Sequence, residues 1–148
     1  MSVGDDYMYA ALDLAKYIVY KCVRENQPIS NLKLQKILYN IQKFNLNEYN
    51  RPFFNDSIEA WQFGPVVPSV YYHYCGYGAM PITNSTESFP VELSFNQTIN
   101  NIIEIKRQLS PWQLVAETHR PDGAWSKVYQ NGQGNHRIMP LRLIKEEV

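Results

Sequence analysis

Cysteines, export signals and long apolar runs are scarce or missing in this sequence. Its 148 residues include two cysteines, Cys22 and Cys75, which lie far apart and form no CxxC pair. No apolar run approaches the ~18 residues that span a bilayer, and residues 1–6 contain neither a basic nor an apolar segment. We therefore expect a cytoplasmic protein without a membrane partner, whose thiols are buried and form no disulfide.

A surplus of charge of either sign is also missing. Lys and Arg together number 14, as do Asp and Glu, so the formal net charge is zero. This balance excludes a DNA-packaging protein, a polybasic membrane binder and a disordered acidic tail. Lys33, Lys36 and Lys43 could touch phosphates, but no tight basic run and no RNA-binding aromatic signature accompanies them. We expect these lysines to be solvated, and we do not expect nucleic acid as a partner.

Motifs for metal and nucleotide binding are absent from the sequence. His73, His119 and His136 are 46 and 17 residues apart, without the HxxxH or HExxH spacing of a zinc site. Neither GxGxxG nor GxxxxGK[ST] occurs. Thr118 and His119 are adjacent, but neighbours on a helix point about 100° apart and cannot act on each other. We expect no metal, no cofactor and no catalytic residue; the alternative is a small hydrolase or transferase that uses His119.

Aromatic residues, by contrast, are abundant. The chain is 45% hydrophobic and 14% aromatic, with 11 Tyr and 3 Trp. Tyr and Trp bury a large area at low entropic cost and are therefore favoured at binding surfaces. A core rich in tyrosine would give the same composition, so both interpretations stay open. The length fits one domain over residues 1–148.

Hydrophobic periodicity and cap residues predict a mostly α fold. Ser30, Ser94 and Ser110 are good N-caps. Together with apolar residues at helical spacing, they predict helices over residues 5–25, 30–46, 68–74, 94–109, 110–119, 124–129 and 140–147.

Two short strands and one long loop complete the predicted fold. Residues 57–63 alternate in polarity and residues 137–139 follow a glycine-containing loop, so both segments are predicted strands. Residues 79–92 are small and polar and contain proline, which predicts a surface loop. The expected architecture is a compact single-domain bundle of about six to seven helices with a small two-stranded β element.

The helix predicted over 30–46 carries polar residues on two of its faces. Its apolar stripe consists of Leu34, Ile37, Leu38 and Ile41. Half-exposed polar groups are expected beside that stripe, at Gln35, Tyr39 and Gln42. Such groups either satisfy buried backbone or contact a partner, and the pattern leaves both open. Lys36 and Lys43 are expected to face solvent.

The segment after the predicted strand at 57–63 has the composition of a structural motif. It consists of Gly64, Pro65, Val66, Val67 and Pro68. The Gly-Pro pair turns the chain sharply, and glycine tolerates a backbone φ that other residues resist. The two valines are expected to anchor the next helix in the core, and the second proline fits its first position. Trp61, just before the turn, is either a core residue or a partner contact.

Three segments, in this order and at this spacing, resemble one known family. They are ISNLKLQKILYNIQ (29–42), IEAWQFGPVVPSVYYHY (58–74) and THRPDGAW (118–125). Together they resemble the Panacea family of SocA-like and GepA-like proteins, often found in prophages and mobile elements. The string EAW-x-x-GPVVPSVY is the most specific part. The chain departs from the family's pattern at 121–124, which holds one acidic residue where the family often has several.

The resemblance implies an antitoxin, which neutralises a toxin encoded beside it by direct protein contact. Residues that match the family's motifs and are expected to bind the toxin are Gln35, Tyr39, Gln42, Trp61, Tyr71, His119 and Trp125. A phage-associated adaptor or regulatory protein that acts on host proteins is the second interpretation. The resemblance leaves open which toxin is bound, and whether it is blocked or delivered to a host protease.

Overall fold

The computed structural model describes residues 8–147, which form seven α-helices, three short 3-10 helices and three strands. The α-helices are α2 (Ala11–Arg24), α3 (Asn31–Tyr49), α4 (Pro68–Tyr74), α5 (Gln97–Lys106), α6 (Pro111–Thr118), α7 (Ala124–Tyr129) and α8 (Leu141–Glu146). The strands are β1 (Glu59–Trp61), β2 (Gly64–Val66) and β3 (Arg137–Ile138), and the 3-10 helices are Cys75–Tyr77, Val91–Phe95 and Gln130–Gly132. This content confirms the mostly α fold.

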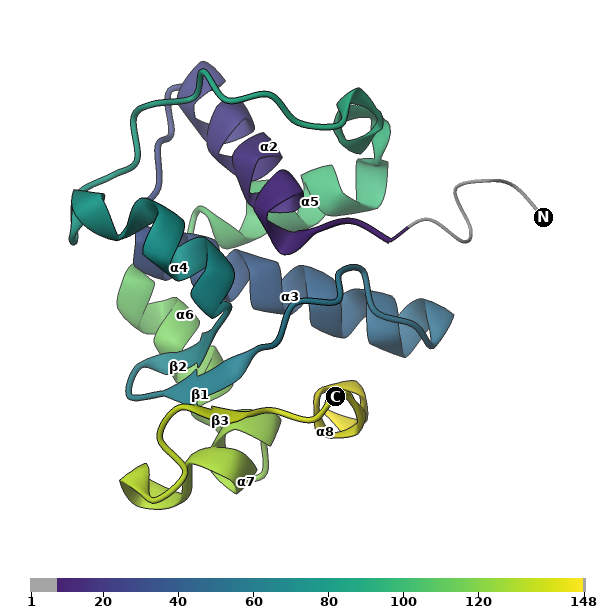
Figure 1. Ribbon diagram of the computed structural model, residues 1–148, viewed down its shortest axis with the longest axis vertical. Coiled ribbons are helices and arrows are strands. Elements are labelled where there is room, and N and C mark those ends of the chain that lie inside the picture. The colour runs from purple at the N-terminus through teal and green to yellow at the C-terminus, as the bar shows by residue number, and fades with distance from the viewer. Residues whose placement is uncertain (1–7, 148) are drawn as a thin grey trace.

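Helix α3 lies at the centre of the molecule. Helices α2, α4, α5, α6 and α8 and strand β2 all pack against it. In Figure 1, α2 and α5 lie on one side of α3, and the sheet with α7 and α8 lies on the other. The predicted apolar stripe is buried, but residues on the remaining faces of the helix are buried as well. A helix surrounded in this way has to hold its polar side chains in internal hydrogen bonds.

The sheet has one strand more than predicted. Its order is β2-β1-β3 with both pairs antiparallel, and Trp61 lies opposite Gly64 across the first pair. The two predicted strands correspond to β1 and β3. Gly64, which was expected to end a strand, instead begins β2, because its φ of +114° reverses the chain directly after Gln62 and Phe63. A positive φ of this kind favours glycine.

The starts of two helices differ from the prediction. Residues 5–7 of the first predicted helix lie outside the described residues, and α2 begins at Ala11, whose backbone N–H donates to Asp56. Helix α5 is capped by Asn96, whose side chain accepts from the backbone N–H of Ile99 at 3.0 Å. The predicted cap, Ser94, lies instead in the preceding 3-10 helix and bonds to Val91. The start of α2 is thus set by Asp56, which is distant in the sequence, and the start of α5 by Asn96, which replaces Ser94 as the cap.

The predicted starts of three other helices agree with the structure, and the predicted end of α3 does not. Ser30 caps α3, and Ser110 forms a capping box with Gln113 at the start of α6. Pro68 occupies the first turn of α4, as expected. Helix α3 extends past its predicted end to Tyr49 and stops where Asn50 adopts a left-handed conformation.

The predicted surface loop at 79–92 is held against α2 and the start of α3. Ile82 is buried and its backbone N–H donates to the carbonyl oxygen of Ile29 at 2.8 Å. Phe89 packs against the rings of Tyr17 and Tyr20. The loop therefore crosses the surface as predicted, but local anchors fix its path.

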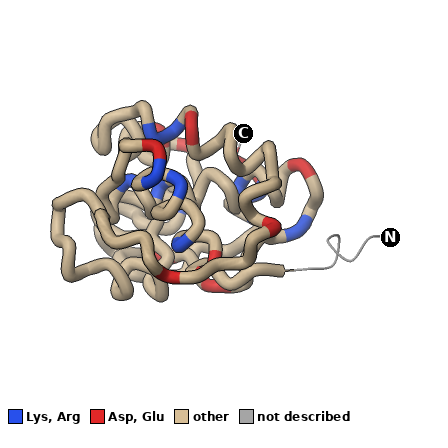
Figure 2. The backbone as a smooth tube through the Cα atoms, turned by 90° about the horizontal axis from the view of Figure 1, so that it is seen from above, with Lys and Arg blue, Asp and Glu red and all other residues tan. Residues whose placement is uncertain are grey.

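The cysteines and the charged residues complete the description. Cys22 is buried, whereas Cys75 is exposed, which contradicts the expectation of two buried thiols; both are free. Figure 2 shows charges of both signs scattered along the chain. Between residues 8 and 147, the structure contains no helix with the length and apolar character required to cross a membrane.

Candidate functional site

The polar residues of α3 point inward, which corrects the prediction that they are half-exposed or solvated. Relative exposure is 1% for Gln35 and Tyr39 and 0% for Gln42 and Lys36. The prediction treated α3 as a helix with one buried face, but neighbouring elements cover it all round. Each of these side chains hydrogen-bonds to a segment that packs on the helix, and most of the acceptors and donors are backbone groups.

Gln35 joins α3 to the end of strand β2 and to α4. Its side-chain oxygen accepts from the backbone N–H of Val67 at 2.8 Å, and its amide donates to Asn31 at 2.9 Å. Asn31 in turn donates to the carbonyl oxygen of Tyr71 at 3.1 Å. Two neighbouring amide side chains thus bond α3 to the start of α4, at Val67, and to its middle, at Tyr71.

Gln42 fixes the chain that enters the sheet. Its side-chain oxygen accepts from the backbone N–H groups of Phe53 and Phe54 at 2.7 and 3.2 Å. Its amide donates to the carbonyl oxygen of Phe54 at 2.8 Å. Three bonds to two backbone positions satisfy this buried amide, so Gln42 acts as a support for the loop before β1.

Tyr39 joins α3 to the C-terminal part of the described chain. Its hydroxyl donates to the Glu147 carboxylate at 2.7 Å, and that carboxylate also accepts from the backbone N–H of Ala124 at 3.1 Å. Lys43 lies 3.5 Å from the same carboxylate, so its ammonium pairs with Glu147 instead of facing open solvent. Burial, followed by the Glu147 charge, raises the pKa of Tyr39 far above its usual value.

Lys36 is the most unusual of these residues. It is completely buried, and its Nζ donates to the carbonyl oxygen of Pro65 at 3.0 Å. No ion pair joins it to any Asp or Glu within residues 8–147. Burial lowers the pKa of the Lys36 amine to about 7, since a charged amine without a counterion is costly in the interior.

Trp125 and His119 pack behind the hairpin formed by β1 and β2. The indole N–H of Trp125 donates to the carbonyl oxygen of Trp61 at 2.7 Å. The His119 ring stacks on Trp125 with centroids 3.8 Å apart and an angle of 8° between the ring planes. Trp125 is buried and His119 is half-buried, so both of them support the hairpin from behind.

The chemistry around His119 offers no assembled catalytic group. Burial, followed by the nearby Lys36 amine, lowers the pKa of His119. The hydroxyl of Thr118 donates to the carbonyl oxygen of Val115 at 2.8 Å. Among the described residues, no three His, Cys, Asp or Glu side chains are grouped as metal ligands.

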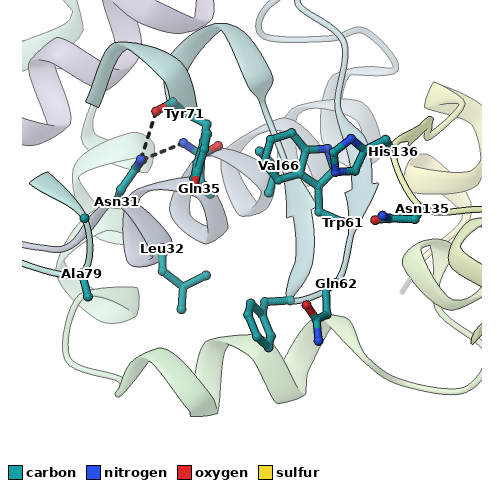
Figure 3. A pocket seen from close by; sticks show the side chains of 12 residues that line it. Asn31, Leu32, Gln35, Trp61, Gln62, Val66, Tyr71, Ala79, Asn135 and His136 are labelled. Carbon is teal, nitrogen blue, oxygen red and sulfur yellow. Dashed lines mark hydrogen bonds between the residues drawn. The ribbon is translucent and has the colours of Figure 1, made fainter. Parts of the chain in front are cut away.

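A pocket of about 450 Å³ opens on the outer side of the hairpin (Figure 3). Its lining is Asn31, Leu32, Gln35, Trp61, Gln62, Phe63, Val66, Tyr71, Gly78, Ala79, Asn135 and His136. None of these residues is Asp, Glu, Lys or Arg. The pocket is therefore mainly apolar and aromatic, with amide groups as its polar component, a composition that suits an uncharged ligand group.

Trp61 lines this pocket and contacts two of its other aromatic rings. Its indole stacks on the His136 ring at 4.4 Å and meets the Tyr71 ring edge-on at 4.9 Å. It is half-buried, and its indole N–H donates to Glu59 at 2.9 Å. Trp61 is thus packed against neighbouring rings but is not fully buried, and its role as a partner contact stays a prediction.

Exposed aromatic rings continue the surface beyond the pocket. Phe63 at the hairpin tip is 46% exposed and meets the ring of Trp112 on α6, which is 64% exposed, at 5.7 Å. Tyr72 is 61% exposed and lies beside Trp61 and Tyr71. We call Trp61, Phe63, Tyr71, Tyr72 and Trp112 the aromatic surface. An exposed cluster of this kind is typical of a protein-binding site.

The structure brings together some of the predicted partner-binding residues and separates others. Trp61 and Tyr71 belong to the aromatic surface, and the buried Gln35 lies at the pocket floor. In the predicted structural motif, Gly64, Pro65, Val66 and Val67 are buried and Pro68 is half-buried.

Sequence reasoning missed Phe63, Tyr72, Trp112 and His136. Phe63 and Tyr72 lie inside the segment 58–74 that resembles the Panacea family. The neighbouring residues in the sequence do not indicate that these two rings are exposed. Trp112 and His136 reach the hairpin from distant segments. Only the packing of α6 and β3 against the hairpin reveals them.

Comparison with known proteins identifies the family of this chain. A family model described as "Antitoxin SocA-like, Panacea domain" matches residues 34–126, which include the hairpin, α4, α6 and Trp125. Antitoxin SocA of Caulobacter vibrioides (strain NA1000 / CB15N) is 32% identical over 142 residues, covering 88% of this chain and 75% of that protein. No solved structure matches the chain significantly. The chain, with its central α3 and the hairpin it supports, therefore belongs to the SocA-like antitoxin family and contains a Panacea domain.

Proposed function

We propose that this protein is an antitoxin that neutralises a toxin encoded beside it by direct contact. Membership of the SocA-like family and the likeness to a relative named as an antitoxin support this role. The observation that supports contact as the means is the aromatic surface around an uncharged pocket. Aromatic anchors of this kind contribute most of the free energy at many protein interfaces.

The toxin contact is proposed to involve the aromatic surface and the pocket. Of the predicted partner-binding residues, Trp61 and Tyr71 are accessible there. The remaining five are proposed to support the contact from within: Gln35, Tyr39, Gln42, His119 and Trp125. Residues 1–148 are proposed to act as one domain, since α2, α4, α5, α6 and α8 pack on the same central helix.

Co-expression with the toxic product of the neighbouring gene tests this proposal. The parent chain should restore growth and co-purify with that product. Phe63→Ala combined with Trp112→Ala should weaken the complex by about 2 kcal/mol or more, because both rings are exposed anchors. Phe95→Ala is the matched control, since Phe95 is 81% exposed but lies in the 3-10 helix before α5. Equal affinity of the double variant and the control would contradict the proposed surface.

The same cells separate two ways of neutralising the toxin. If the antitoxin blocks the toxin, rescued cells contain as much toxin as cells that express an inactive toxin alone. If it delivers the toxin to a host protease, the amount of toxin falls during rescue and recovers when the protease gene is deleted. A quantitative immunoblot of the toxin in the three strains gives the answer.

A further inference from the structure

Three side chains hold the hairpin that carries the aromatic surface. Gln35 accepts from the backbone N–H of Val67, Trp125 donates to the carbonyl oxygen of Trp61, and Lys36 donates to the carbonyl oxygen of Pro65. Gln35 and Lys36 are adjacent on α3. They therefore bond the chain to the central helix at two points, Pro65 within strand β2 and Val67 directly after it.

The fit at the Lys36 bond is tight. Gly64 precedes the Pro65 carbonyl, and a Cβ at Gly64 would lie 3.0 Å from Cε and Nζ of Lys36 and 2.8 Å from the hydroxyl oxygen of Thr118. The strand can approach α3 this closely only because residue 64 has no side chain. The Lys36 amine thus occupies the space directly beneath the strand.

Stability alone gives no reason for an amine in this position. Lys36 is completely buried, donates to one neutral carbonyl and forms no ion pair with a described carboxylate. Replacing a buried ionisable group by an apolar one of similar volume is often neutral or stabilising. The amine provides a directional hydrogen bond that fixes the distance and the register of β2 relative to α3.

We propose that Lys36 is a positioning residue for toxin binding. Its bond to Pro65 fixes the β1–β2 hairpin, and the hairpin in turn places Trp61 and Phe63 of the aromatic surface. This inference rests on the proposed function, because it assigns Lys36 to the contact described there. The expectation from sequence that Lys36 faces solvent would have given it no such role.

The test compares Lys36→Met with a matched control on the same helix. Lys33 also lies on α3 and also donates its amine to a backbone carbonyl, that of Arg107 at 2.7 Å, but away from the hairpin. Lys33→Met therefore controls for the loss of a lysine amine bonded to backbone. For each variant we would measure the melting temperature, the affinity for the purified neighbouring-gene toxin, and the indole N–H signals of Trp61 and Trp125 by NMR.

The expected result separates positioning from stability. Lys36→Met should melt at or above the temperature of the parent, yet bind the toxin about tenfold more weakly, as for a lost oriented hydrogen bond. The indole signals of Trp61 and Trp125 should shift in Lys36→Met and stay in place in Lys33→Met. A merely structural role would move the melting temperature and the affinity downward together.

Two outcomes would overturn this inference. Toxin affinity of Lys36→Met equal to that of the parent is one, and a joint fall of melting temperature and affinity is the other. Failure of the parent chain itself to bind the toxin would contradict the proposed function instead, so the two failures are distinguishable. The NMR comparison needs no toxin and would still show whether Lys36 sets the hairpin.

Discussion

At the scale of single residues, the buried Lys36 and the half-buried His119 next to the hairpin carry the most information. Lys36 and His119 both have lowered pKa values because of burial, and the Lys36 amine adds to the shift of His119. A strongly lowered pKa such as that of Lys36 often marks a functional site. Here, however, Lys36 bonds to backbone and His119 stacks on Trp125, so both residues act on the arrangement of the hairpin.

Stability should rise with pH because of Lys36. Its amine has a pKa of about 7 in the folded protein and 10.5 as the usual value. Between pH 7 and pH 10.5 the unfolded chain binds more protons than the folded chain, so the free energy of unfolding increases with pH. Below pH 7 the amine is protonated in both states, and its contribution to the free energy of unfolding no longer changes with pH. Denaturant unfolding at pH 7 and pH 10 should show a gain on the order of 3 kcal/mol in the parent.

Lys36→Met is the control for that pH profile, because it removes the group that titrates. The difference in unfolding free energy between the parent and Lys36→Met should be largest at pH 7 and shrink towards pH 10, whatever other groups titrate. A difference that does not change between pH 7 and pH 10 would mean that the Lys36 amine has the same pKa in the folded and the unfolded chain, which would contradict the lowered pKa.

His119→Gln should preserve growth rescue and lower toxin affinity only slightly, because the His119 ring supports Trp125 and does not line the pocket. The substitution removes a ring that stacks on Trp125, which costs about 1 kcal/mol of stability, but no proton transfer is expected to depend on His119. Growth rescue and toxin affinity in His119→Gln check this. Loss of protection with fold and binding unchanged would support the alternative that the protein is an enzyme.

At the scale of elements, the helix ends and short strands depend on side chains from other elements. Glu147, just after α8, accepts from Tyr39 on α3 and from the backbone N–H of Ala124 on α7. A Cβ at Gly123 would lie 2.6 Å from that carboxylate, so the turn before α7 is shaped around it. One carboxylate therefore ties three helices together.

Glu147→Ala should destabilise the protein by about 2 to 3 kcal/mol, because it leaves a buried tyrosine hydroxyl and a backbone N–H without their acceptor. Tyr39→Phe should cost less, about 1 kcal/mol, since the carboxylate keeps Ala124 and Lys43. Thermal and denaturant unfolding measure both. Toxin affinity should stay within twofold of the parent in Tyr39→Phe; a large loss there would restore Tyr39 as a direct contact.

At the scale of the whole molecule, charge is balanced and the proposed contact is uncharged. The formal net charge is zero, and the pocket is lined by no Asp, Glu, Lys or Arg. Long-range steering between charged surfaces is therefore a small part of the expected binding free energy.

Toxin affinity should consequently change little between low and moderate salt. Rim charges alter association rate and salt dependence, whereas aromatic anchors act mainly through the dissociation rate. Surface binding kinetics at about 0.05 and 0.3 M salt would separate the two, since screening lengths fall well below the size of the interface over this range. A steep loss of affinity with salt would point to a charge-led surface.

The sequence by itself determined most of the helices and the family, whereas the pairing of β1 with β2 appeared only in the structure. Apolar stripes at helical spacing and the Ser30, Pro68 and Ser110 start signals are local, so α3, α4 and α6 begin where predicted. The resemblance to the Panacea family likewise rests on three short segments, each of which is continuous in the sequence. Gly64, with its special φ, is the clearest single case of a residue type that reveals its own backbone.

Only the tertiary structure decided which polar residues are inside. Periodicity describes a helix with one buried face, but α3 is covered on every side, so Gln35, Lys36, Tyr39 and Gln42 are buried and bond inward. The number of neighbours around a helix is not encoded in that helix. Trp112 and His136 reach the hairpin for the same reason: their positions depend on how α6 and β3 pack, which is a property of the assembled chain.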